Sequence, residues 1–354
     1  MGQQSKLRYR DLLGVLKDKA SLTKAVILTS SLNLTIVRAT THDPSTIPHE
    51  KDIDTLLSYG HSSRIPAANC INAIMNRLQN THDSFVAFKC LVMIHYIIRR
   101  GSFILQDQLT IYPLTGGHNY LNLSKFRDNS SLERWEMSSW VRWYARVLEY
   151  ILCTFRIMGF FICSVTSHPN SSKQEHEEKV SALMNIDLIK EIDTLTGFIE
   201  ELCRAPELLN IRDKGLVHEV MRLMGEEFSS SQREILIRLS ELEQRVGTLS
   251  FGDSVELVCI FKRLESCKER LLVLFINRKG GLGEVLWGLI RDLKEKVTIE
   301  KECGERRLVK AGWRGKFSES ARFGERILRL GDSVMFSSGR MALDWVPTPI
   351  LESG

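Results

Sequence analysis

Apolar residues recur along this chain with the spacing of helices rather than of strands. Over residues 65–78 they return every three or four positions, and residues 85–98 are apolar nearly all round. The first pattern is typical of a helix with one buried face, and the second of a helix surrounded by core. Asp83 and Ser84 before the second run predict a helix cap, and Gly101 after it predicts a stop.

Similar patterns cover most of the chain, and no alternating strand pattern of convincing length interrupts them. We expect helices over residues 5–19, 21–37, 48–60, 65–78, 85–98, 103–112, 135–165, 176–204, 207–227, 231–247, 251–276 and 284–297. Short connections between them favour stacked antiparallel helix pairs. Pro169 to Ser172 mark the strongest break and the best candidate domain boundary. The sequence therefore predicts an all-α protein.

The charge of the chain is concentrated at its start. Over 354 residues the net charge is +5, which by itself is too small to imply nucleic acid. Residues 1–42 hold seven basic and two acidic side chains, and seven minus two already equals the excess of the whole chain. This distribution points to an anionic partner, an acidic membrane or a nucleic acid. Few aromatic residues are interleaved with the basic tail, so a nucleic-acid partner is not favoured.

Cysteine usage and targeting signals favour a cytosolic protein. The eight cysteines include no C-x-x-C pair, which favours buried free thiols over zinc or disulfides. The first 24 residues are charged throughout and show no signal peptide. The most apolar run, residues 157–165, is far shorter than the roughly 20 residues that a membrane-spanning helix needs.

Little in the sequence suggests an enzyme. The histidines lie apart from any recognisable nucleophile, and no metal-ligand spacing is present. His95, inside the apolar run, is expected to be a hydrogen-bonded core residue. The glycine-rich stretch at residues 279–283 lacks both a preceding strand and the Gly-Lys-Ser/Thr ending of a phosphate loop. We therefore expect no catalytic residues, no metal and no cofactor.

The segment from Ile36 to Lys51 is the best candidate binding site. It links an apolar segment to a helix expected to have Pro48 in its first turn, and it presents Arg38, His49 and Lys51 near that helix start. The start of a helix carries unpaired N–H groups and partial positive charge, so anions bind there. The alternative is an ordinary helix–helix connection whose polar residues are merely solvated.

Four segments, in this order, resemble the ANTH-domain clathrin assembly proteins. They are Arg38–Asp43 (RATTHD), Phe85–His95 (FVAFKCLVMIH), Leu121–Asp128 (LNLSKFRD) and Met137–Ala145 (MSSWVRWYA). Residues 28–34 further resemble the plant branch of that family. The resemblance is specific over about residues 5–160, and the helices up to about residue 276 fit the second half of the family's domain more loosely.

The resemblance implies a fold and a domain order. The fold is a right-handed superhelical solenoid of stacked antiparallel helices, followed by a further helical bundle region and a short tail. Residues 1–168 correspond to the phosphoinositide-binding solenoid and residues 173–297 to the C-terminal helical half of the domain. Residues 298–354 are expected to be a basic, partly disordered tail.

The resemblance also implies a function. Family members bind phosphatidylinositol 4,5-bisphosphate on membranes, promote clathrin coat assembly and sort SNARE cargo in clathrin-mediated endocytosis. The implied partners are the clathrin heavy chain, the plasma-membrane adaptor complex and a vesicle SNARE. The implied location is peripheral and cytoplasmic, at clathrin-coated pits and vesicles and at the Golgi apparatus. The alternative is a helical protein–protein scaffold in vesicle trafficking without strong lipid or clathrin binding.

Carried over residue by residue, the resemblance assigns a lipid site. Arg38 fills the place of the basic residue before the Ala-Thr loop, and Lys51 that of the last lysine of the family's cluster. His49 stands where another lysine is usual, and Glu50 and Asp52 replace basic, His or Tyr residues. Three lysines of the basic start complete the candidate set: Lys17, Lys19 and Lys24.

Overall fold

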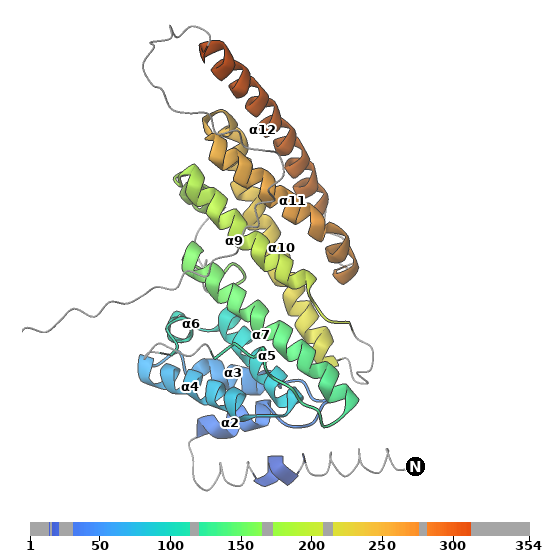
Figure 1. The fold of residues 1–354 in the computed structure, drawn as a ribbon. Helices are drawn as coiled ribbons and strands as arrows, with labels where there is room; N and C mark the ends of the chain where they lie inside the picture. Colours follow the sequence, from blue (N-terminus) through green and yellow to red (C-terminus); the bar gives the residue numbers. More distant parts are fainter. Residues whose placement is uncertain are drawn as a thin grey trace, which may run out of the picture. The chain divides into compact units, whose positions relative to one another are not determined.

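The computed structural model describes residue 14 and residues 16–20, 31–113, 120–164, 173–207, 215–275 and 282–312. All regular structure in these ranges is helical, which confirms the predicted all-α class (Figure 1). The elements are α2 (Ser31–Ala39), α3 (Glu50–Ser58), α4 (Arg64–Asn80), α5 (Ser84–Arg100), α6 (Phe103–Thr110), α7 (Leu132–Met158), α8 (Lys173–Ser181), α9 (Asn185–Cys203), α10 (Gly215–Gln244), the 3₁₀ helix η1 (Val246–Thr248), α11 (Phe251–Leu274) and α12 (Leu282–Gly312).

Helix α5 is the centre of the first half of the fold. Every residue from Ser84 to Ile98 is buried, as the run of apolar residues predicts. The helix packs against α3, α4, α6 and α7. The Asp83 carboxylate caps its start by accepting hydrogen bonds from the N–H groups of Phe85 and Val86, which confirms the predicted cap.

Helix α7 connects the two halves, because it packs against both α5 and α9 (Figure 1). Trp140 and Trp143 lie in its buried face, and the Trp143 indole N–H donates to the carbonyl of Glu201 on α9 (2.9 Å). The helix ends at Met158, earlier than predicted. The next residue, Gly159, has a φ of +80°, a left-handed conformation that glycine adopts at low cost and that commonly terminates a helix.

In the second half, α9 packs against α10 and α11. One face of α12 is buried, at the helical spacing of Leu286, Ile290 and Leu293, and Lys294 forms an ion pair with Glu265 of α11 (2.7 Å). Residues 1–306 belong to one compact unit, and the chain divides after it. Since α12 continues to Gly312, residues 298–312, which the sequence assigned to the tail, are helical.

Three predicted helices in the second half were divided wrongly. Residues 176–204 form α8 and α9 rather than one helix, and the two predicted helices between residues 207 and 247 are the single helix α10. The serine run inside α10 does not break it. The hydroxyls of Ser229 and Ser231 donate to carbonyls one turn earlier (2.9 and 2.8 Å), so the helix itself satisfies them.

Smaller differences concern boundaries. The prediction that Pro48 lies in the first turn of the second helix was wrong, because His49 is the N-cap of α3 and Pro48 precedes it. Of the predicted helix over residues 21–37, only the part from Ser31 onward is described. The predicted break at Pro169–Ser172 lies outside the described residues.

Candidate phosphoinositide site

The loop from Thr40 to His49, between α2 and α3, rests on a buried lysine of α5. The Lys89 ammonium donates to the carbonyls of Thr41 (3.1 Å) and Asp43 (2.6 Å). It also donates to the hydroxyls of Thr41 (3.0 Å) and Thr46 (2.8 Å). The Lys89 side chain is fully buried, so these four oxygens replace its water and fix the path of the loop.

The charge of Lys89 has no carboxylate among its hydrogen-bond partners. Burial lowers the pKa of Lys89 to about 8, although the nearby charges of Asp43 and Asp18 act in the opposite direction. At neutral pH the ammonium is still mostly protonated. The loop therefore lies over a cation whose direct partners are carbonyl and hydroxyl dipoles.

A second cation, Arg77 of α4, holds the end of α2. Its guanidinium donates to the carbonyl of Thr40 (3.0 Å) and to the Thr40 hydroxyl (3.2 Å). That hydroxyl in turn donates to the carbonyl of Ile36 (2.6 Å). The last carbonyls of a helix carry partial negative charge, so a guanidinium there is stabilising. Arg77 and Lys89 together place two positive groups beneath the loop.

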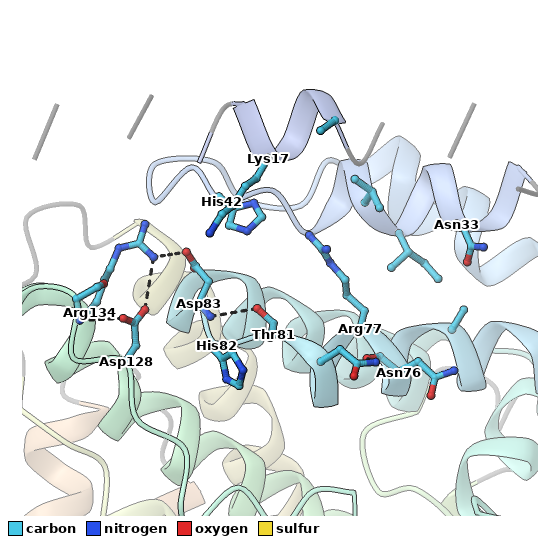
Figure 2. Close-up of a pocket in the computed structure, with 16 residues that line it drawn as sticks. Lys17, Asn33, His42, Asn76, Arg77, Thr81, His82, Asp83, Asp128 and Arg134 are labelled. Carbon is cyan, nitrogen blue, oxygen red and sulfur yellow. Dashed lines mark hydrogen bonds and ion pairs between the residues drawn. The ribbon is translucent and has the colours of Figure 1, made fainter. Parts of the chain in front are cut away.

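The amino-terminal segment contacts the same loop through His42. The His42 imidazole lies 2.5 Å from one carboxylate oxygen of Asp18, and the His42 backbone N–H donates to the other (2.9 Å). Both side chains are largely shielded from solvent. This contact brings residues 16–20, including Lys17, next to the loop (Figure 2).

The structure places the predicted lipid-binding residues at the two ends of the loop. Arg38 lies in the last turn of α2, His49 occupies the N-cap position of α3 without a side-chain capping hydrogen bond, and Lys51 lies in its first turn. All three side chains are exposed, and in the described part of the chain none of them has a side-chain hydrogen bond or ion pair. Helices α2 and α3 pack together, so both ends belong to one region of the fold.

Of the three amino-terminal lysines in the predicted set, the structure describes two. Lys17 and Lys19 are exposed, in the segment that Asp18 attaches to the loop. Lys24 lies outside the described residues.

The acidic residue beside Lys51 is engaged elsewhere. Glu50 forms an ion pair with Arg100 at the end of α5, and Arg100 also pairs with Asp54 (2.7 Å). The hydrogen bond from Glu50 raises the pKa of the Arg100 guanidinium. Asp52 has no such partner among the described residues and is half-buried. One of the two carboxylates that the sequence places near the site is thus already compensated.

A cavity of about 970 Å³ lies behind the loop (Figure 2). Lys17 and His42 line one side, and Arg77 of α4 lines another. At a further wall Arg134 forms ion pairs with Asp83 and with Asp128, the latter at 3.5 Å.

The carboxylates of this wall have their hydrogen-bonding partners within the protein. Burial would raise the pKa of Asp128, but hydrogen bonds from Ser130 and from the Ser84 backbone, with Arg134 nearby, hold it below its usual value. Asp128 accepts from the Ser84 N–H at 3.0 Å and from the Ser130 N–H at 3.1 Å. These contacts connect the start of α5 to the start of α7. Because Arg134 is paired with two carboxylates, the positive charge in the cavity lining comes from Lys17 and Arg77.

Sequence reasoning missed Lys89, Arg77 and Arg100. The available signal for Lys89 was a single lysine inside a run that is otherwise apolar all round. Its partners are backbone and hydroxyl oxygens more than forty positions earlier in the chain, so the sequence around Lys89 does not indicate them.

Two further observations concern other classes of site. Over the ranges described, no group of three or more His, Cys, Asp or Glu side chains is placed to hold a metal ion. No helix within those ranges is sufficiently long and apolar to cross a bilayer.

Comparison with known proteins identifies the family. The ANTH domain family matches residues 31–279. An Arabidopsis thaliana protein named "Putative clathrin assembly protein At4g40080" is 47% identical over 346 residues, which cover 94% of this chain and 94% of the relative. Another, "Putative clathrin assembly protein At5g65370", is 31% identical over 299 residues, or 80% of this chain and 98% of the relative. The chain therefore belongs to the ANTH domain family.

Proposed function

We propose that this protein binds membranes that carry phosphatidylinositol 4,5-bisphosphate through the loop between α2 and α3. Arg38, His49 and Lys51 contact the headgroup, and Lys17, Lys19 and Lys24 add attraction from the amino-terminal segment. The observation that carries the proposal is the distribution of charge. The side chains of Arg38, His49 and Lys51 have no carboxylate partner among the described residues, whereas the adjacent Glu50 is paired with Arg100, which it shares with Asp54.

The buried cations support the same surface from below. Lys89 and Arg77 fix the loop through its carbonyls and hydroxyls, so the backbone between Arg38 and His49 is already ordered before a lipid arrives. Their charges add to the positive potential at the loop, because the groups that they directly contact are carbonyl and hydroxyl oxygens rather than carboxylates.

The expected affinity of one domain is low. Each Lys or Arg near an anionic membrane contributes about 1 kcal/mol, so three or four of them give roughly 3–4 kcal/mol. That corresponds to a dissociation constant of about a millimolar. Stable attachment then requires several lipids per protein or several proteins in one coat. A weak, multivalent tether suits an adaptor that must leave the membrane again.

The names of the relatives extend the proposal to clathrin. We infer that the protein acts as an endocytic adaptor that promotes clathrin coat assembly, with the clathrin heavy chain, the plasma-membrane adaptor complex and a vesicle SNARE as partners. Its place is then the cytoplasmic face of clathrin-coated pits and vesicles, with the Golgi apparatus as a further compartment. Pulldown of purified clathrin with the full chain tests this part, and absence of binding contradicts it.

Vesicle sedimentation tests the lipid site. Full-length protein is mixed with phosphatidylcholine vesicles containing phosphatidylinositol 4,5-bisphosphate, or phosphatidylserine at equal charge. The double variant Arg38→Glu/Lys51→Glu should lose most of its sedimentation with the first vesicles. A larger loss there than with phosphatidylserine indicates headgroup recognition, and an equal loss indicates attraction to charge alone.

A matched control separates the loop from overall charge. Arg233 and Lys262 are exposed on α10 and α11, in the second half of the fold. Arg233→Glu/Lys262→Glu changes the net charge from +5 to +1, since 5 − 4 = 1, as the loop variant does. Only the loop variant should lose binding. Equal losses would show that the loop is not the membrane-binding site. Wild-type protein that binds neither kind of vesicle would favour the scaffold alternative.

A further inference from the structure

Two cysteines meet where α9 ends against the middle of α11. The Cys203 thiol donates to the carbonyl of Cys267 (3.8 Å), and the two helices are packed together. Cys267 is 5% exposed, whereas Cys203 is half-buried, so small solutes can reach the pair from the Cys203 side. Both thiols are free in the structure.

The two cysteines influence each other's protonation through this contact. A hydrogen bond between them raises the pKa of Cys203 and lowers that of Cys267 to about 7, with Ser266 and Arg263 also lowering the latter. Arg270 lies beside the pair and donates to the backbone carbonyl of Cys203 (3.4 Å). Near neutral pH a substantial share of the pairs thus carries one thiolate, the form that reacts.

The other buried cysteines of the described chain lack this arrangement. Burial raises the pKa of Cys70 and of Cys90 to about 12, which keeps both as unreactive thiols. Cys259 is exposed on α11 and serves as an internal comparison. Thiolate character and a partner thiol occur together only at Cys203 and Cys267 within the described residues.

We propose that Cys203 and Cys267 form an oxidisable pair that closes a disulfide between α9 and α11. The oxidant is a peroxide. A thiolate sulfur of the pair attacks the outer oxygen, the O–O bond breaks, and the sulfur becomes a sulfenic acid. The second thiol then attacks that sulfur, forms the S–S bond and releases the oxygen as water. In total two thiols and hydrogen peroxide give one disulfide and two waters, a two-electron oxidation of the protein.

The disulfide would act on the second half of the fold. It joins residues that lie far apart in sequence, so it removes conformational freedom from the unfolded chain and raises the melting temperature. It also joins α11 covalently to α9, the helix that packs against α7. The oxidised form should therefore be stiffer at the α9–α11 contact. This inference is independent of the lipid-binding proposal.

The test uses the full chain, treated with hydrogen peroxide under limiting conditions and then alkylated and digested. Mass spectrometry should find the Cys203 and Cys267 peptides linked, with the loss of two hydrogen atoms. The melting temperature should rise by about 4 °C or more and return after reduction with dithiothreitol.

Single variants complete the test. Cys203→Ser should abolish both the linked peptide and the rise in melting temperature, and Cys267→Ser should do the same if it folds. Cys259→Ser should retain both. The proposal is overturned if peroxide converts Cys203 or Cys267 to a sulfinic acid without linkage, if Cys259 forms the linked peptide instead, or if the Cys203→Ser protein still gains thermal stability.

Discussion

Two buried cations, one in each half of the fold, are held in opposite ways. Arg238 of α10 is 2% exposed and donates to the carboxylates of Glu191 on α9 (2.5 Å) and Glu234 (2.7 Å). Glu234 also contacts His176 of α8 (3.0 Å). Lys89 is equally buried, but its four acceptors are carbonyl and hydroxyl oxygens of the loop between α2 and α3.

The two cations differ in whether a carboxylate compensates their charge. Arg238 has two carboxylate partners, and Lys89 has none among its hydrogen-bond partners. The charge of Arg238 is fully compensated by two carboxylates, so the cluster carries no net positive charge from it, and the ion pair with Glu191 holds α9 against α10. The charge of Lys89 is stabilised by dipoles but not cancelled by a direct partner. Under the proposed function, this charge adds to the positive potential at the loop. Four measurements test this difference between the two cations.

The largest effect is expected for Arg238→Met. Removing the guanidinium leaves Glu191 and Glu234 buried without their partner, which should lower the free energy of unfolding by about 3–5 kcal/mol. Urea unfolding followed by circular dichroism measures it. Arg233→Met, an exposed arginine on the same helix, is the control and should change stability by less than about 0.5 kcal/mol. Similar losses for both variants would mean that the buried cluster contributes no special stability.

A smaller loss is expected for Lys89→Met. The carbonyls of Thr41 and Asp43 lose their donor, at a cost of about 1–3 kcal/mol, but the cost of burying a charge is relieved at the same time. The backbone amides of residues 41–46 should exchange with deuterium at least about tenfold faster while those of α9 do not change. Unchanged exchange in the loop would show that Lys89 does not hold it.

The dependence of stability on pH distinguishes Lys89 further. Its pKa is about 8 in the folded protein and near 10.5 in the unfolded chain, so between these values the unfolded chain binds more protons. The free energy of unfolding should therefore rise with pH, by at most about 1.4 kcal/mol per pH unit, relative to the Lys89→Met variant. Parallel curves for the two proteins between pH 8 and pH 10 would contradict the lowered pKa.

The smallest effect on stability is expected for Glu50→Gln. The pair of Glu50 with Arg100 is largely exposed, and such pairs contribute roughly 0.2–1 kcal/mol. Binding to vesicles that contain phosphatidylinositol 4,5-bisphosphate should nevertheless increase by a factor of a few, because a negative charge is lost beside Lys51 while Arg100 keeps its ion pair with Asp54. Asp193→Asn, which releases Arg263 from an ion pair on α9 and α11, is the matched control and should leave vesicle binding unchanged.

The fold could be predicted from the sequence wherever local signals decide it. Asp83 caps α5, and the apolar run that follows is buried throughout, because capping and hydrophobic periodicity are properties of neighbouring residues. The serine run in α10 misled the prediction for the opposite reason. Serine is common at breaks, and only the helix geometry shows that the hydroxyls of Ser229 and Ser231 bond back to the preceding turn.

The candidate site could be predicted in part. The positions of Arg38, His49 and Lys51 around a loop and a helix start follow from the sequence. Their relation to Lys89 and Arg100 does not, because those side chains reach the loop from α5, a contact between segments far apart in the chain. The sequence placed Glu50 next to the expected phosphate, and only the fold shows which cation it faces.

Helix α7 gives one side to α5 and the other to α9, so both halves bury their hydrophobic residues against the same helix. Neither half can melt without exposing a face of α7, and the two should unfold together in a single transition. Force applied to the loop between α2 and α3 is then transmitted from α5 through α7 to α9 by packed side chains. The region from this loop to α9 should therefore respond to mechanical tension as one element rather than two.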